Sequence, residues 1–145
     1  MIQSAIMTQG MHYKIEEHRD RDLIIARHYR YNSADDVRAY LEAFVASCKA
    51  YPYKRLLADY SKLEEVNLSF IDKIRVLGQY SHFTVKKVAR TMKQAVVTSN
   101  DFQKAIAQQA RSLSSAEAGD NITGTAHYFD SEEEALAWLL NDDLL

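Results

Sequence analysis

Short apolar runs, which predict strands, alternate along the chain with longer segments in which apolar residues recur every three or four positions. The first two runs, residues 12–17 and 23–29, flank the polar stretch RDRD at 19–22. This arrangement predicts an antiparallel hairpin. Three later apolar runs predict further strands, at 55–60, 94–99 and 124–130.

Four helices are predicted, one after the hairpin and one after each later strand. Their expected bounds are about 33–49, 68–92, 100–113 and 131–140. The second region is either one long helix or two segments that break near residues 78–84. The small, polar stretch 114–121 is expected to form a flexible loop.

Capping residues and apolar spacing refine these helices. The candidate caps are Asn32 or Ser33, Asn100 with Gln103, and Ser131 with Glu134. The expected buried faces of the second and third helices include Ile71, Ile74 and Gly78, and Phe102, Ile106, Ala110 and Leu113. In the last helix, Ala135, Leu136, Trp138 and Leu139 are expected to face the sheet.

The order of these elements predicts the fold class. Two strands followed by alternating helices and strands require mostly parallel pairing with right-handed crossovers. We therefore expect an α/β fold: a mixed, mostly parallel sheet of about five strands with about four helices packed on it. Residues 1–10 are expected to be a loose lead-in, without the features of a secretory signal, and residues 11–145 a single domain.

Composition and charge narrow the setting. The chain has 145 residues, enough for one core, and a net charge of −2 from 18 basic and 20 acidic residues. This balance argues against a nucleic-acid surface, which requires a basic excess. No apolar run approaches the roughly 20 residues that span a bilayer. The single cysteine, Cys48, fits a reducing, cytoplasmic setting, which we expect for this protein.

Few residues suggest chemistry. The five histidines show no metal-ligand spacing, and the four glycines cannot form a phosphate loop. No G-x-S-x-G nucleophile motif is present. We therefore expect no metal, no other cofactor, no catalytic residues and no enzymatic activity. His28 and His127 lie in predicted strands, where a structural, hydrogen-bonded role is expected.

Two further groups are candidate binding residues. The basic residues Lys86, Lys87 and Arg90 are a candidate patch for an anion or an acidic partner, although a solvated helix face is the favoured interpretation. Tyr51 and Tyr53 flank the only proline and could line a ligand pocket or an interface. A place in the core is the favoured interpretation for these tyrosines.

The last strand and helix carry a family resemblance. Phe129 precedes an acidic cap at 130–134 and the sequence ALAWL at 135–139. This ending resembles the SpoIIAA-like proteins, a bacterial group in the anti-sigma-factor antagonist (STAS) and SEC14-like fold class. The segment 95–110 is similar to the penultimate strand and helix of that group. The resemblance covers the order of elements from about residue 11 to 140.

The resemblance also implies candidate phosphorylation sites. Anti-sigma antagonists carry Asp-x-Ser at a strand end and then a phosphorylated serine in an Asp-Ser-Ser-Gly turn. Here Asp59 and Ser61 match the first motif, whereas only Ser69 lies near the second. Phosphate at Ser69 would add about −1.5 to −2 charges at a helix start. A helix cap formed by Ser69 with Asp72 is the favoured interpretation.

Two functions follow from these observations. The first is a non-catalytic regulatory or interaction domain that binds a protein partner and is a candidate homodimer. The alternative, which the SEC14-like side of the resemblance implies, is a carrier or sensor of a small apolar ligand or lipid. An enzyme ranks third, because it would require a cluster of perturbed titratable groups in a cleft.

Overall fold

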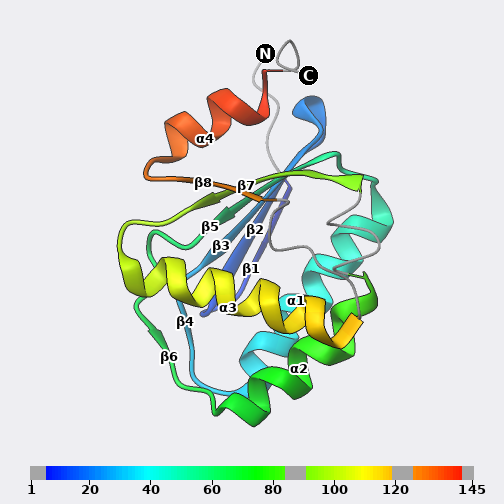
Figure 1. Cartoon of the computed structure of the whole chain (residues 1–145). Coiled ribbons are helices and arrows are strands. Elements are labelled where there is room, and N and C mark those ends of the chain that lie inside the picture. The colour runs from blue at the N-terminus through cyan, green and yellow to red at the C-terminus, as the bar shows by residue number, and fades with distance from the viewer. Residues whose placement is uncertain (1–5, 84–90, 119–125, 142–145) are drawn as a thin grey trace.

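The structure is a computed structural model that describes residues 6–83, 91–118 and 126–141. Six strands form the main sheet, in the spatial order β1-β2-β3-β5-β7-β8 (Figure 1). Their bounds are Ile6–Gln9 (β1), Tyr13–His18 (β2), Leu23–His28 (β3), Arg55–Asp59 (β5), Lys93–Val97 (β7) and Ala126–Phe129 (β8). The first three pair antiparallel, and β3, β5, β7 and β8 pair parallel. The predicted mixed, mostly parallel sheet is therefore confirmed.

Helices cover both faces of this sheet. Figure 1 shows three of them on one side and the C-terminal helix on the other. Their bounds are Ala34–Ala50 (α1), Phe70–Phe83 (α2), Asp101–Ala118 (α3) and Glu132–Leu139 (α4). A 3-10 turn, Arg19–Arg21 (η1), joins β2 to β3, and a small parallel sheet pairs β4 (Arg30–Tyr31) with β6 (Glu65–Val66).

The predicted helix starts at Ser33, Asn100 and Ser131 are observed. The Asp36 N–H donates to Ser33 Oγ, while Asp36 Oδ2 accepts from the Ser33 N–H, which completes a capping box. At α3 the Gln103 N–H donates to Asn100 Oδ1 over 2.9 Å. At α4 the Ser131 hydroxyl accepts a hydrogen bond from the N–H three residues later. These bonds occupy backbone donors that the first helical turn leaves unpaired.

Strand alternation divides the core between the two faces. Along β3, Ile24, Ala26 and His28 point toward α1–α3, whereas Leu23, Ile25 and Arg27 point toward α4. The α4 face is closed by side chains with 0% exposure, among them Leu57, Ala95, Ala135 and Leu139. Leu136 and Trp138 pack against this cluster, so the predicted inner face of the last helix is confirmed.

Two predictions about element bounds are wrong. The expected lead-in contains β1, which pairs with β2 from Ile6–Glu17 to Gln9–Lys14 and adds a sixth strand. Four residues are too few to show a clear alternation, so the strand is defined by its pairing and not by its pattern. The expected loop at 114–121 is helical as far as Ala118, because α3 continues without a break. Residues 119–125 lie outside the described residues.

The expected faces of α2 and α3 also need correction. Ile71 is 66% exposed and Phe102 46% exposed, although both were expected to be buried. In α2 Val76 is buried and Lys73, Ile74, Leu77 and Gly78 are half-buried, so the inner side is shifted from the expected one at Ile71 only. Lys73 lines a cavity on this side, and its amine donates a hydrogen bond to Gln109 Oε1. Residues 84–90 are outside the described residues, so the choice between one helix and two stays open.

Candidate functional site

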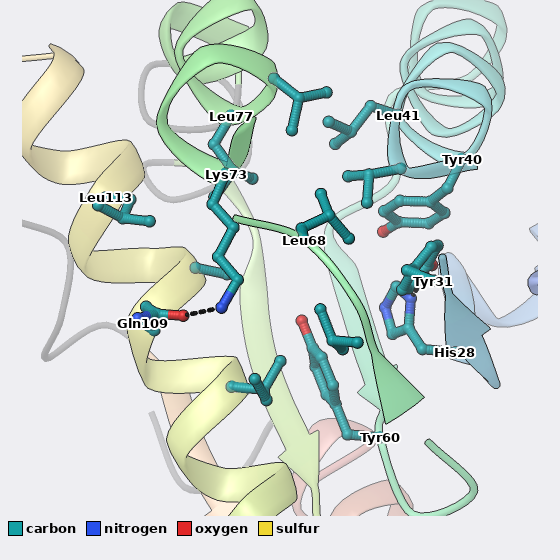
Figure 2. Close-up of a pocket in the computed structure, with 15 residues that line it drawn as sticks. His28, Tyr31, Tyr40, Leu41, Tyr60, Leu68, Lys73, Leu77, Gln109 and Leu113 are labelled. Atoms are coloured by element: carbon teal, nitrogen blue, oxygen red, sulfur yellow. Dashed lines mark hydrogen bonds between the residues drawn. The ribbon is translucent and has the colours of Figure 1, made fainter. Parts of the chain in front are cut away.

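Two adjoining cavities lie between the sheet and helices α1, α2 and α3. Their volumes are about 100 Å³ and 120 Å³, and Figure 2 shows the first. We call the pair the aromatic cavity. The walls that the two share are formed by His28, Tyr40, Leu41, Tyr60, Leu77 and Ala110. Residues from strand ends and three helices therefore meet at one place on the sheet.

Strand register places the two central rings together. His28 is the last residue of β3, and Tyr60 follows the last residue of β5. These strands are parallel neighbours, with Arg27 opposite Asp59, so the next residue on each strand points to the opposite face. The centroids of the His28 and Tyr60 rings consequently lie 4.6 Å apart on the cavity side.

Two further tyrosines complete the aromatic wall. Tyr40 comes from α1, and its ring meets the His28 ring edge-on at 4.7 Å. Tyr31 comes from β4, and its hydroxyl lies 2.5 Å from His28 Nδ1 in a hydrogen bond. This bond satisfies one nitrogen of a buried imidazole, which would otherwise destabilise the fold. His28 thus has the structural, hydrogen-bonded role expected from the sequence.

These rings are electrically neutral near pH 7, and burial moves their pKa values farther from neutrality. Burial lowers the pKa of His28 to about 4, although the charge of Asp59 acts in the opposite direction. Burial raises the pKa of Tyr60 to about 12, with a smaller opposing effect from Arg111. Burial also raises the pKa of Tyr40 well above its ordinary value. The aromatic wall therefore offers neutral hydrogen-bonding groups and no charge of its own.

The hydroxyls of Tyr40 and Tyr60 face the cavity. Both residues line both cavities, and in Figure 2 their oxygens point into the space between the helices and the sheet. Among the residues that the structure describes, neither hydroxyl has a hydrogen-bond partner. Polar groups in an apolar setting generally find a partner, so these two oxygens are available to a bound molecule.

The charged residues in the cavity walls are basic. Lys73 of α2 lines the first cavity and donates from Nζ to Gln109 Oε1 of α3 over 2.8 Å (Figure 2). Arg111 lines the second and donates from Nη1 to Gln94 Oε1, also over 2.8 Å. Burial lowers the pKa of Arg111. No Asp or Glu is among the described residues that line either cavity.

On the opposite face, Arg27 joins three carboxylates. Its Nη1 donates to Asp59 Oδ2 over 2.8 Å and to Glu132 Oε1 over 2.5 Å, and its Nε donates to Glu16. Burial alone would raise the pKa of Glu16, but the hydrogen bond and charge of Arg27 lower it. This cluster ties β2, β3 and β5 to the start of α4, and we assign it a structural role.

The predicted tyrosine pair lies away from the aromatic cavity. The rings of Tyr51 and Tyr53 are 4.6 Å apart, and Tyr53 is buried in the core with its hydroxyl donating to Glu17 Oε1 over 2.7 Å. Tyr53 also borders a separate hollow of about 530 Å³ that reaches Met92. Tyr51 is not among the described residues that line this hollow, so a ligand pocket formed by the tyrosine pair stays a prediction.

The structure places the two candidate serines in turns. The N–H and Oγ of Ser61 both donate to Asp59 Oδ1, at 2.9 Å and 2.6 Å. Ser69 is exposed, and its Oγ accepts from the Asp72 N–H at the start of α2 over 3.1 Å. The capping interpretation of Ser69 is therefore observed, and phosphorylation of either serine stays a prediction. The candidate patch of Lys86, Lys87 and Arg90 lies outside the described residues.

The aromatic cavity was not predicted as a site from the sequence. One feature of the sequence could have indicated it. His28 and Tyr60 each come directly after the paired residues Arg27 and Asp59 of two neighbouring parallel strands, so their side chains lie on the same face of the sheet. The described residues contain no group of three or more His, Cys, Asp or Glu placed to hold a metal. Within the same ranges, no helix has both the length and the apolar character needed to cross a membrane.

Helices cover both faces of a mixed sheet, which makes this a small α/β fold, and the aromatic cavity lies between the sheet and α1–α3. A model of the SpoIIAA-like family matches residues 31–140, more than half of the chain, and the chain belongs to that family. This membership confirms the resemblance of residues 129–139. It also supports a general regulatory or interaction domain.

Comparison with individual proteins adds little to this assignment. Among solved structures, the chain is similar to an uncharacterized protein from the DUF3478 family with a SpoIIAA-like fold, from Shewanella loihica PV-4. The identity is 13% and the TM-score 0.46, over 94% of this chain and 92% of that one. A likeness at this level carries no argument about function. No curated protein matches the chain.

Proposed function

We propose that this domain is a non-catalytic sensor that encloses a small, largely apolar molecule in the aromatic cavity. The observation that supports it is the cavity itself, which lies between the sheet and three helices and is lined mainly by aromatic and aliphatic side chains. Concave, mostly apolar sites with a few polar groups are the usual form of small-molecule sites.

The size of the cavity favours a ring or a short chain over a whole lipid. Its two parts measure about 100 Å³ and 120 Å³. An engineered apolar cavity of about 150 Å³ holds benzene. A ligand of one ring with a short substituent therefore matches the available space.

The protonation states of the lining groups favour binding over catalysis. A general acid or base works best when its pKa lies near the operating pH. Burial moves the pKa of His28 to about 4 and that of Tyr60 to about 12, both away from neutrality. These groups are suited to accept or donate fixed hydrogen bonds, and poorly suited to transfer protons at pH 7.

Benzene binding tests this proposal. We expect saturating benzene to shift the methyl NMR signals of Leu41 and Leu77, which line the cavity, and to leave Leu57 on the opposite face unchanged. Ala110→Leu, which fills the shared wall, should abolish the shifts. Ala105→Leu, at an exposed position of the same helix outside the cavity lining, is the matched control. Shifts absent in the wild type, or unchanged in Ala110→Leu, would contradict the proposal.

Binding of a protein partner, including a second copy of the chain, is the second candidate function. The specific observation is the exposed pair Phe70 and Ile71 at the start of α2, with exposures of 58% and 66%. Sedimentation velocity of the wild type and Ile71→Glu tests the homodimer. A dimer that Ile71→Glu dissociates and Phe102→Glu leaves intact would support it, and a monomer at high concentration would contradict it.

We place the protein in the cytoplasm as part of this proposal. Cys48 is free, and burial raises the pKa of its thiol to about 12, with the charge of Glu17 adding to the effect. A protonated, partly buried thiol is chemically inert, which agrees with a packing role in a reducing compartment.

A further inference from the structure

We propose that the ligand of the aromatic cavity is a small apolar monocarboxylate, bound with its carboxylate between Lys73 and the hydroxyl of Tyr60. This inference rests on the proposed function and specifies the chemical class of the molecule bound. Three observations support it: the positive charges in the cavity wall, the hydroxyls of Tyr40 and Tyr60, and the position of the Lys73 amine.

Charge complementarity favours an anion. The described residues that line the two cavities include the cations Lys73 and Arg111 and no carboxylate. The observed partner of the Lys73 amine is the side-chain oxygen of Gln109, a neutral amide, which hydrogen-bonds the ammonium without neutralising it. A positively charged ligand would be repelled from this wall, and a neutral ligand would leave the lysine charge unbalanced.

The amine of Lys73 is placed to receive such an anion. Its stem descends from α2 along the cavity, and Figure 2 shows its Nζ at the side of the cavity toward α3. An ammonium has three N–H donors, and Gln109 Oε1 takes one of them over 2.8 Å. The remaining donors can bind a carboxylate oxygen in the charge-assisted geometry that makes such hydrogen bonds strong.

The tyrosine hydroxyls supply neutral donors to the same group. Tyr60 reaches into the cavity from the sheet side, opposite Lys73, and its hydroxyl has no partner among the described residues. Because burial raises the pKa of Tyr60 to about 12, its oxygen keeps the proton and donates it to a hydrogen bond. Tyr40 offers a second such hydroxyl from α1.

The remaining wall fits the apolar body of the ligand. Leu68, Leu77, Ile106 and Leu113 surround the first cavity, and His28 contributes a neutral ring. A ring or a short alkyl chain can pack among these side chains while its carboxylate stays between Lys73 and Tyr60. Removing that apolar surface from water contributes roughly 25 cal/mol per Å² to binding.

A matched pair of probes tests the charge requirement. Phenylacetate and 2-phenylethanol share a ring and a two-carbon chain and differ in the carboxylate. By isothermal titration at pH 7.5 we expect the wild type to bind phenylacetate about tenfold more tightly than 2-phenylethanol. Lys73→Gln should remove this preference, because it weakens the binding of phenylacetate more than that of 2-phenylethanol. Lys62→Gln, which changes an exposed lysine outside the cavity, is the control.

The outcomes separate this inference from the proposed function. Equal affinity of the wild type for the two probes, or a preference that survives in Lys73→Gln, overturns the carboxylate assignment while binding in the cavity stands. Failure of both probes and of benzene to bind overturns the proposed function as well. Tyr60→Phe gives an independent check if Lys73→Gln unfolds, because it should weaken phenylacetate binding about threefold to tenfold. Unchanged affinity in Tyr60→Phe contradicts the assigned position of the carboxylate.

Discussion

The two faces of the sheet are covered in different ways. Under α4, small and branched residues such as Ala95, Ala135 and Leu139 are fully buried, and Arg27 joins three carboxylates at the edge of this layer. Under α1–α3, bulky rings meet around His28 and enclose the aromatic cavity. One sheet thus carries a close-packed layer on one side and a hollow layer on the other.

The difference follows from side-chain shape and suggests a division of roles. Under α4 the small side chains of Ala95 and Ala135 pack with Leu57 and Leu139 in one cluster, and all four are fully buried. Tyrosine and histidine rings line the α1–α3 side, and they leave the aromatic cavity unfilled between the sheet and the three helices. We expect the α4 face to supply stability and the α1–α3 face to supply binding, since binding sites commonly sacrifice packing.

Removal of Arg27 is expected to have the largest effect. Arg27→Ala leaves Glu16, Asp59 and Glu132 without their shared cation in a site where the arginine side chain is 16% exposed. Loss of one partner of a buried ion pair destabilises proteins by about 3–5 kcal/mol. Urea unfolding at pH 7 measures this change in the free energy of unfolding.

The control for Arg27 is an exposed ion pair. Arg30 contacts Glu64 on the surface, with side-chain exposures of 48% and 67%. Arg30→Ala should change the free energy of unfolding by less than about 1 kcal/mol. Similar losses in Arg27→Ala and Arg30→Ala would show that the Arg27 cluster is not a special support of the α4 face.

Acidification should destabilise the α1–α3 face through His28. The pKa of His28 is about 4 in the folded protein, below its ordinary value of 6.5, so the unfolded chain binds the proton first. The neutral imidazole therefore contributes stability that is present above pH 6.5 and is lost as the pH falls from 6.5 toward 4. The loss amounts to about 3 kcal/mol, at about 1.4 kcal/mol for each pKa unit.

A glutamine variant isolates this effect. His28→Gln removes the titrating ring, so its free energy of unfolding should fall less than that of the wild type between pH 7.5 and 4.5. Glu16 and the other carboxylates titrate in both proteins, so their contributions to the loss of unfolding free energy cancel when the two losses are subtracted. Chemical unfolding at the two pH values provides the measurement, and parallel losses in the two proteins would refute the assignment.

Leucine substitutions compare the packing of the two faces directly. Ala135→Leu inserts atoms into the filled layer under α4, and overpacking of this kind destabilises proteins by about 1–3 kcal/mol. Ala110→Leu inserts the same atoms into the wall of the aromatic cavity and should cost less than about 0.5 kcal/mol. Thermal unfolding of both variants measures the contrast. Equal destabilisation would mean that the two faces are packed alike.

Loss of the cap at α2 is expected to have the smallest effect. Ser69→Ala removes the oxygen that accepts from the Asp72 N–H and should destabilise the fold by about 1 kcal/mol. Ser69→Asp keeps an acceptor at the same place and should restore most of the stability. A loss in urea unfolding that Ser69→Asp fails to restore would contradict the capping role.

The sequence predicts the order of elements well because periodicity records which side of each element is buried. The apolar run of Leu56, Leu57 and Ala58 is visible without a structure, as are the caps at Ser33 and Ser131. Short strands cannot be predicted in this way, because β1, β4 and β6 have only two to four residues each, too few to show a periodic pattern. These strands are recognised only from the strands with which they pair.

The cavity could not be predicted in the same way. Tyr40 and Tyr60 satisfy the pattern of a filled core, and a pattern of apolar positions does not record whether the space between side chains is filled. The wall also includes Lys73, which hydropathy treats as a surface residue. Only the packing of three helices against the strands shows that these residues surround a hollow.

The central claim is that one face of the sheet is hollow and the other filled. Xenon enters apolar cavities without needing a hydrogen bond, so xenon-dependent methyl NMR shifts test the claim directly. Dissolved xenon should shift the methyl signals of Leu41, Leu77 and Ala110 and leave those of Leu57 and Leu139 in place. Equal shifts on both faces, or no shift on the α1–α3 face, would contradict the account.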